Sequence, residues 1–181
     1  MAQHWYAVRV KPRHEKRVSE IFGYKQIEPL LPLYRARNRW SDRMKEVELP
    51  LFPGYVFCKL DPMFRVPVLS TPGVIDIVRF GKEPAVIDAV EVAALKRLMA
   101  SGLAPEPWPH LVPGERVEID DGPLAGCAGV IIEVKKRLRL VLSVTLLHRS
   151  VLVELDRSWV TRIPQPTRLQ SASSALLSPA H

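Results

Sequence analysis

The chain has 181 residues, of which 47% are hydrophobic and 25% charged, so most of it should fold into one or two small globular domains. Its net charge of +7 favours a polyanionic partner such as nucleic acid or a ribonucleoprotein. Only Cys58 and Cys127 are present, which favours free thiols in a reducing compartment, and no apolar run is long enough to span a bilayer. We therefore expect a cytoplasmic protein that does not enter the membrane.

The first part of the chain predicts strands interrupted by two helices. Residues 14–22 place apolar side chains at helical spacing, with Gly23 expected in a left-handed cap. The period of two in residues 51–60 puts Tyr55 and Phe57 on one face of a strand. Asp88 and Glu91 form a capping-box pattern at the start of the second helix. The expected strands cover residues 5–10, 30–34, 51–60 and 75–80, and the helices cover 14–22 and 89–100.

Residues 35–48 carry alternating polar and apolar positions around Ser41 and Asp42, which indicates a hairpin with basic arms. Such a hairpin can bind phosphates through its cations, and Trp40 can stack on a base. A solvated charged hairpin with Trp40 on the protein's own core explains the same pattern.

The order of these elements does not follow the regular alternation of a parallel fold, so we predict an α+β domain over 1–103 with an antiparallel sheet and flanking helices. Three prolines within residues 104–110 predict a semi-rigid linker. Residues 164–181 are rich in Ser, Pro and Ala and are expected to be a disordered tail.

A second domain is expected over 111–163, because five short β-rich runs with turn signals predict a small five-stranded SH3-like barrel. Its runs cover residues 115–119, 127–136, 138–145, 151–155 and 159–163. Gly122, Gly126 and Gly129 give the backbone freedom for a tight turn and a sharp return into the next strand.

No catalytic or metal-binding motif is found in the sequence. The five histidines lack metal-ligand spacing, and the glycine cluster at 122–129 has neither the lysine nor the helix of a phosphate loop. We therefore predict a protein that is not an enzyme and uses no cofactor and no metal.

The spacing of glycines in residues 114–134 matches the KOW motif of transcription elongation factors and some ribosomal proteins. Upstream, the Trp5-Tyr6 strand, the block Leu51-Phe52-Pro53-Gly54-Tyr55, and the segments 71–74 and 78–81 occur in a set order. Together these features resemble the NusG/RfaH family over residues 4–163. The resemblance implies an NGN-type domain followed by a KOW barrel.

Family members bind the clamp helices of the largest RNA polymerase subunit through an apolar face of the first domain. The resemblance therefore implies a polymerase-binding face formed by Tyr55, Phe57, Val92, Arg9 and Trp5. From the residues alone, Tyr55 and Phe57 packing under the protein's own helix remains an alternative. Arg9 stands where RfaH-like members carry an aromatic residue, so an ionic contact is expected there.

The resemblance also implies further contacts. Non-template DNA would contact two segments, the hairpin and the residues after the 51–60 strand. The residues implied are Arg37, Arg39, Trp40, Arg43 and Lys45 in the hairpin, and Arg65 after the strand. A ribosomal small-subunit protein or Rho would meet the loop between the third and fourth barrel strands, that is Leu146, Leu147, His148 and Arg149. Leucines that simply cap the open end of the barrel are the alternative for this loop.

The function expected from these features is a monomeric transcription elongation and antitermination factor that tethers a second machine to polymerase. The compact hairpin and the residues around 61–64 and 78–81 favour a specialised, operon-specific member of the family. The alternative is a KOW-containing protein of the ribosome or its assembly that binds RNA.

Overall fold

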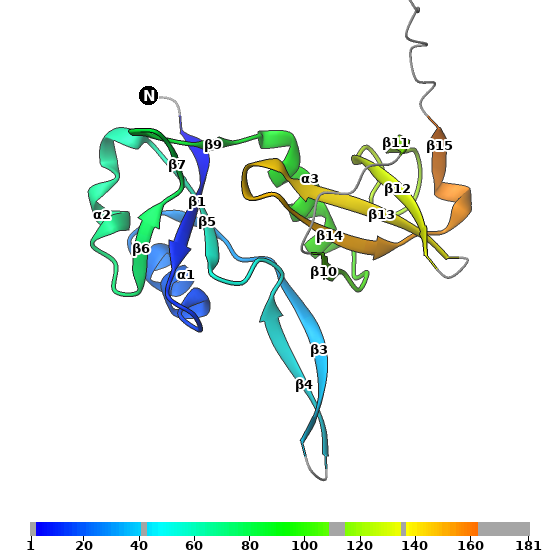
Figure 1. Cartoon of the computed structure of the whole chain (residues 1–181), viewed down its shortest axis with the longest axis horizontal. Coiled ribbons are helices and arrows are strands. Elements are labelled where there is room, and N and C mark those ends of the chain that lie inside the picture. The colour runs from blue at the N-terminus through cyan, green and yellow to red at the C-terminus, as the bar shows by residue number, and fades with distance from the viewer. Residues whose placement is uncertain (1–2, 41–42, 109–114, 135–136, 163–181) are drawn as a thin grey trace, which may run out of the picture.

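The computed structural model describes residues 3–40, 43–108, 115–134 and 137–162. They form an α+β domain, a projecting hairpin and a second β domain, as Figure 1 shows. The antiparallel sheets and few helices confirm the predicted fold class. The expected tail over 164–181 lies outside the described residues.

The first domain is built on an antiparallel sheet in the order β2-β5-β1-β6, with β9 also paired to β1. Alternation along β1 and β5 gives the sheet two apolar faces. Its strands are β1 (His4–Val10), β2 (Glu28–Leu30), β5 (Tyr55–Leu60), β6 (Val74–Ile77) and β9 (Val86–Ile87). Two two-residue strands, β7 (Arg79–Phe80) and β8 (Glu83–Pro84), pair with each other.

Helices cover both faces of this sheet. On one face, Val18 and Phe22 of α1 (Glu15–Tyr24) pack against Tyr6, Val8 and Val56. On the other face, α3 (Ala89–Ala100) buries Val92, Leu95 and Leu98 against a core that includes Trp5, Ala7 and Phe57. A short 3-10 turn, η1 (Pro62–Phe64), and α2 (Val66–Leu69) connect β5 to β6.

Two local expectations in this domain were wrong. Gly23 lies inside α1, which continues to Tyr24, and the left-handed residue after the helix is Gln26 with φ of 59°. The expected strand over 51–60 begins only at Tyr55, because Pro53 and Gly54 form a turn. Leu51 and Phe52 are nonetheless buried, so these two apolar residues mark a place in the core and not the start of the strand.

The hairpin consists of β3 (Leu33–Trp40) and β4 (Arg43–Pro50), which pair with each other and project from the body of the protein (Figure 1). The predicted strand over 30–34 is divided between β2 and β3 because Pro32 lies between them.

The second domain contains the five predicted barrel strands in the order β14-β13-β12-β11-β15. A sixth strand, β10 (Glu106–Trp108), pairs antiparallel with β14 and comes from the segment expected to be linker. The barrel strands are β11 (Glu115–Ile119), β12 (Ala128–Val134), β13 (Arg137–Val144), β14 (Arg149–Glu154) and β15 (Val160–Arg162), with 3-10 turns η2 (Thr145–Leu147) and η3 (Arg157–Trp159).

Candidate functional site

Tyr55 is positioned by a turn that a single glycine makes possible. Gly54 has φ of +84°, a conformation that costs little only for glycine. Its N–H donates to Glu15 Oε1 at 2.9 Å, and its carbonyl accepts from Val10 N at 2.9 Å. The turn is thereby fixed to α1 and β1, and Tyr55 begins the next strand at a defined place on the sheet.

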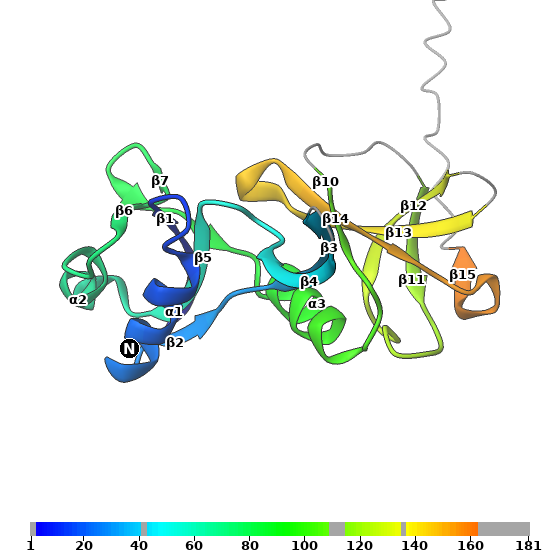
Figure 2. The ribbon, with the colours of Figure 1, turned by 90° about the horizontal axis from the view of Figure 1, so that it is seen from below.

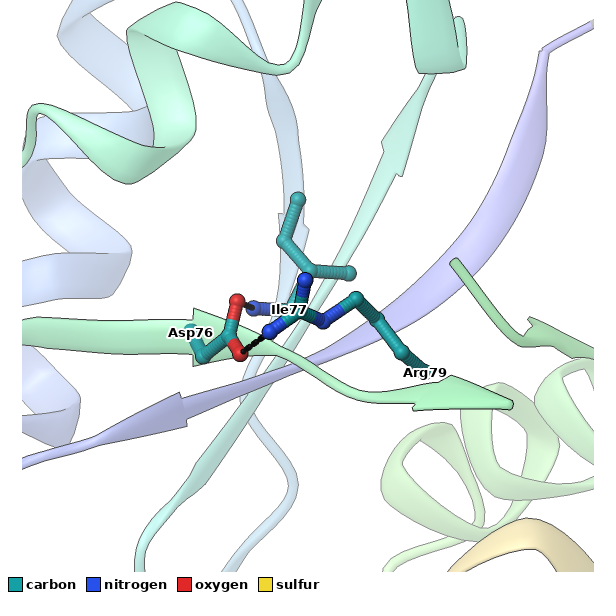
Figure 3. Close-up of polar contacts among 3 residues, drawn as sticks. All are labelled: Asp76, Ile77 and Arg79. Atoms are coloured by element: carbon teal, nitrogen blue, oxygen red, sulfur yellow. Dashed lines mark hydrogen bonds and ion pairs between the residues drawn. The ribbon is translucent and has the colours of Figure 1, made fainter. Parts of the chain in front are cut away.

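Beside Tyr55, a charged row crosses the sheet. Arg9 lies opposite Tyr55 on one side and opposite Asp76 on the other. Asp76 Oδ2 is 2.6 Å from Arg79 Nη2, and Asp76 Oδ1 accepts from Ile77 N at 2.9 Å (Figure 3). These residues line a depression of about 380 Å³, so this part of the expected polymerase face is polar.

Three other residues of that expected face are largely buried. Trp5, Phe57 and Val92 are 8%, 0% and 2% exposed and belong to the core between the sheet and α3. Lys96 Nζ lies 4.5 Å from the Trp5 ring centroid and 2.7 Å from Glu28 Oε1, which covers the outer side of the indole.

The second domain packs against the same side of the first domain. Figures 1 and 2 show the barrel beside α3, with the turn between β13 and β14 directed toward the sheet. One continuous apolar cluster joins residues of both domains, including Leu95 and Leu98 of α3 and Leu142 and Val144 of β13. The barrel therefore covers part of the expected polymerase face.

Polar contacts reinforce this packing at three places. Glu91 Oε1 accepts from Thr145 N at 3.1 Å and from Thr145 Oγ1 at 2.6 Å. Arg97 Nη1 donates to the Ala125 carbonyl at 2.6 Å. The Arg149 guanidinium lies over the Tyr55 ring, 5.7 Å from its centroid.

The barrel loop expected to bind a ribosomal protein or Rho is the one that meets the first domain. Leu147 packs against the shared apolar cluster, and Arg149 contacts Tyr55. His148 is exposed and has φ of 50°, which reverses the chain after η2. The side chain of Leu146 lies outside the described part of the structure.

The hairpin is less uniformly basic than its sequence suggests. Glu48 lies opposite Arg35 and Glu46 opposite Arg37, and Lys16 Nζ is 3.5 Å from Glu48 Oε2. The excess of positive charge therefore lies at the end of the hairpin, where Arg39, Arg43 and Lys45 occur together with the aromatic Trp40. The side chains of residues 37–45 lie outside the described part of the structure.

Arg65, the remaining residue expected to meet DNA, is exposed between η1 and α2. Its neighbours Met63, Phe64 and Val66 are 78%, 64% and 69% exposed. The surface around Arg65 is therefore mainly apolar.

Among residues 3–40, 43–108, 115–134 and 137–162, no group of three His, Cys, Asp or Glu side chains could hold a metal ion. In the same part of the chain, no helix has the length and hydropathy to cross a membrane.

Sequence reasoning missed the residues that join the two domains. Glu91 was interpreted as half of a capping box, whereas its carboxylate binds Thr145. Asp88 does cap α3, through Oδ1 accepting from Val90 N at 2.8 Å. Nothing in the sequence around Arg97 and Ala125 indicates their hydrogen bond, because it depends on how two separate domains pack.

Fold and surface together define a two-domain protein, in which an α+β domain and a small β-barrel share one apolar cluster. The family model described as "Transcription termination factor nusG" matches residues 3–96. This chain belongs to the NusG family.

Individual members of the family can be aligned with most of this chain. It is 30% identical to the transcription termination/antitermination protein NusG of Pseudomonas aeruginosa, over 90% of this chain and all of that protein. It is 32% identical to the protein of the same name from Escherichia coli O6:H1, over 87% of this chain and 95% of that protein. The solved structure "Domain interaction in Thermotoga maritima NusG" has a TM-score of 0.55 and 28% identity, covering 90% of this chain and 98% of that one.

These comparisons confirm the predicted family and make the protein a transcription factor, not an enzyme. They do not support the alternative of a ribosomal or ribosome-assembly protein, because both curated relatives are transcription termination/antitermination proteins.

Proposed function

We propose that the protein binds RNA polymerase through the side of its first domain that carries Tyr55 and α3. The observation that supports this most is that this side is an apolar surface suited to a protein partner, since a second folded domain packs on it. Tyr55 lies at the margin of the covered area, with Arg9 and the Asp76–Arg79 pair beyond it. By resemblance to the family, the partner is the clamp helices of the largest subunit.

Binding at this surface requires the barrel to move. The expected polymerase face and the expected ribosome or Rho loop meet through Tyr55 and Arg149, so in this arrangement each obstructs the other. A partner that binds only the separated domains shifts the equilibrium toward separation. By linkage, polymerase at one surface then favours the second partner at the other, to the same degree in both directions.

Once polymerase is bound, the end of the hairpin, with Arg37, Arg39, Trp40, Arg43 and Lys45, contacts non-template DNA. Cations there neutralise phosphates, so this contact weakens as salt rises. Arg65 contributes a further contact from the exposed segment after β5. The freed loop of Leu146, Leu147, His148 and Arg149 recruits a ribosomal small-subunit protein or Rho, and the protein acts as a specialised, operon-specific antiterminator.

The polymerase surface is tested by two replacements with opposite expected effects. Tyr55→Ala removes a contact to polymerase and should weaken the measured Kd about tenfold or more, as expected for an aromatic interface anchor. Arg149→Ala loosens the barrel from Tyr55 without altering the first domain, so the same measurement should show tighter binding. Phe57 is not a suitable target, because it is fully buried in the core.

The matched control is Tyr24→Ala, since Tyr24 is 88% exposed on α1. Its Kd for polymerase should equal that of the unchanged chain. If Tyr55→Ala and Tyr24→Ala bind polymerase equally well, the surface assignment is wrong. If Arg149→Ala weakens binding, the barrel does not obstruct that surface.

A further inference from the structure

The connection between the two domains has five residues and begins earlier in the chain than the seven-residue linker expected over 104–110. Helix α3 ends at Ala100 and β10 begins at Glu106, so five residues, 101–105, separate two ordered elements. Within these five, Ser101 Oγ donates to the Leu98 carbonyl at 2.7 Å and accepts from Leu103 N at 3.1 Å. Leu103 packs against the shared apolar cluster, and Pro105 is buried.

β10 is the element that makes the connection short. It pairs with β14 through Glu106, Pro107 and Trp108, and Glu106 Oε2 is 2.8 Å from Arg139 Nη1. Were β10 to leave β14, the chain between α3 and β11 would lengthen from five residues to fourteen, 101–114. The pairing of three residues therefore sets the reach of the barrel.

The attachment of β10 is modest in strength. Proline at position 107 has no N–H to give to β14. Trp108 Nε1 and Arg139 Nε are buried, and neither has a hydrogen-bond partner among the described residues. Donors left unpaired in this way disfavour the docked strand, so it can separate while the barrel itself stays folded.

We propose that β10 is a clasp: by pairing with β14 it keeps the tether to α3 short and so favours the arrangement in which the barrel is docked on the first domain. A short tether raises the effective concentration of one domain at the other, and that concentration falls roughly as the −3/2 power of tether length. Lengthening the tether from five residues to fourteen therefore lowers it about fivefold. The proposal concerns contacts within the chain and does not depend on polymerase binding.

The experiment uses the full chain and one six-residue Gly-Ser insertion at two alternative positions. The first lies between Leu103 and Ala104, before β10, and the second between His110 and Leu111, after β10. Both chains are lengthened equally, but only the first insertion lengthens the tether while β10 stays paired. The readout is hydrogen exchange at the Thr145 amide, whose N–H donates to Glu91 of the other domain.

With β10 acting as a clasp, the first insertion should raise the Thr145 exchange rate about threefold and the second should leave it unchanged. Exchange at Leu140, in the middle of β13, reports on barrel unfolding and should be the same in all chains. Equal acceleration by both insertions would show that β10 does not control the tether. No acceleration by either would also overturn the proposal.

A pair of replacements tests the strand itself. Glu106→Ala with Trp108→Ala removes its side-chain contacts and should raise the Thr145 exchange rate by up to about fivefold. The matched control removes the same kinds of side chain from another short strand pair, Phe80→Ala with Glu83→Ala in β7 and β8. If both double variants leave Thr145 exchange unchanged while Leu140 stays protected, β10 is not a clasp.

Discussion

The carboxylate of Glu91 on α3 accepts two hydrogen bonds from a single barrel residue, Thr145, at 3.1 Å from its backbone nitrogen and 2.6 Å from its hydroxyl. A carboxylate acceptor makes such bonds stronger than neutral ones, although both side chains are partly exposed to water. This pair therefore joins the domains through polar contacts that add to their apolar interface.

Replacing Glu91 with alanine should loosen the domains without unfolding either one. Loss of both hydrogen bonds at a partly exposed site costs about 1 kcal/mol, which corresponds to roughly a fivefold increase in domain separation. Cys127 of the barrel is buried, with its Sγ 4.0 Å from Arg97 Nη1 of α3, so its alkylation by iodoacetamide should accelerate by that factor. Glu20→Ala, on the exposed side of α1, is the control, and equal alkylation in the two variants would contradict the role given to Glu91.

Two glycine replacements should change stability in opposite directions. A Cβ at Gly129 would lie 2.6 Å from Leu140 Cδ1 and 2.8 Å from the Val141 carbonyl, so Gly129→Ala should destabilise the barrel by about 1–3 kcal/mol. A Cβ at Gly23 would meet nothing within 4 Å, and the residue lies in α1. Gly23→Ala should therefore stabilise the first domain by about 0.5–1 kcal/mol.

Urea unfolding followed separately in each domain measures both effects. The two variants act as controls for each other, because each alters one domain and leaves the other unchanged. A barrel that tolerates Gly129→Ala without loss of stability would show that β12 and β13 can move apart at little cost.

The sequence correctly predicted those helices, strands and turns that are determined by residues close together in the chain. α3 begins and ends where its cap and periodicity indicate, and the alternation of β5 correctly separates Tyr55 and Phe57 from Val56 and Cys58. Gly122 and Gly126 have the predicted turn roles, with φ of +78° and +76°, whereas Gly129 lies in β12 without a positive φ and leaves room for Leu140. Each of the correctly predicted features is decided within a few residues.

What the sequence did not predict depends on contacts between distant parts of the chain. The proline-rich run around Pro107 has no strand pattern, and it forms β10 only because the edge of β14 is available to it. Glu91 has the spacing of a capping residue, and only the packed barrel brings Thr145 within reach of it. For this reason the expected binding residues could be proposed from sequence, but their mutual obstruction could not.

Cys58 should be unreactive in the folded protein. It is fully buried in the core beneath α1, and burial raises the pKa of its thiol to about 12. Since the thiolate is the reactive form, iodoacetamide at pH 8 should modify Cys58 only when the first domain unfolds. Modification followed by mass spectrometry across a urea series measures this, and a rate near that of a free thiol in the absence of urea would contradict it.

The same pKa has a consequence for stability. A thiol whose pKa is raised on folding contributes its full stability below its unfolded pKa, about 8.5, and loses it as the pH rises toward 12. The free energy of unfolding should therefore fall more steeply above pH 8.5 in the unchanged chain than in Cys58→Ala. Parallel curves for the two chains would show that the thiol does not carry this dependence.

The last prediction concerns Asp88, which caps the helix on which the barrel rests. Its Oδ1 accepts from Val90 N at 2.8 Å, and loss of such a cap costs about 1 kcal/mol. Because Glu91 lies in the first turn of α3, Asp88→Ala should also weaken the hydrogen bonds to Thr145. Urea unfolding and Thr145 amide exchange should therefore both change.

Asp88→Asn tests whether the hydrogen bond of the cap or its negative charge stabilises α3. An asparagine oxygen can accept the same hydrogen bond, so this variant should retain most of the stability and the slow Thr145 exchange. If Asp88→Ala lowers stability but leaves Thr145 exchange as slow as in the unchanged chain, the first turn of α3 is held by the barrel and not by its own cap. In that case the interface orders the helix end, and domain separation would be accompanied by fraying of α3.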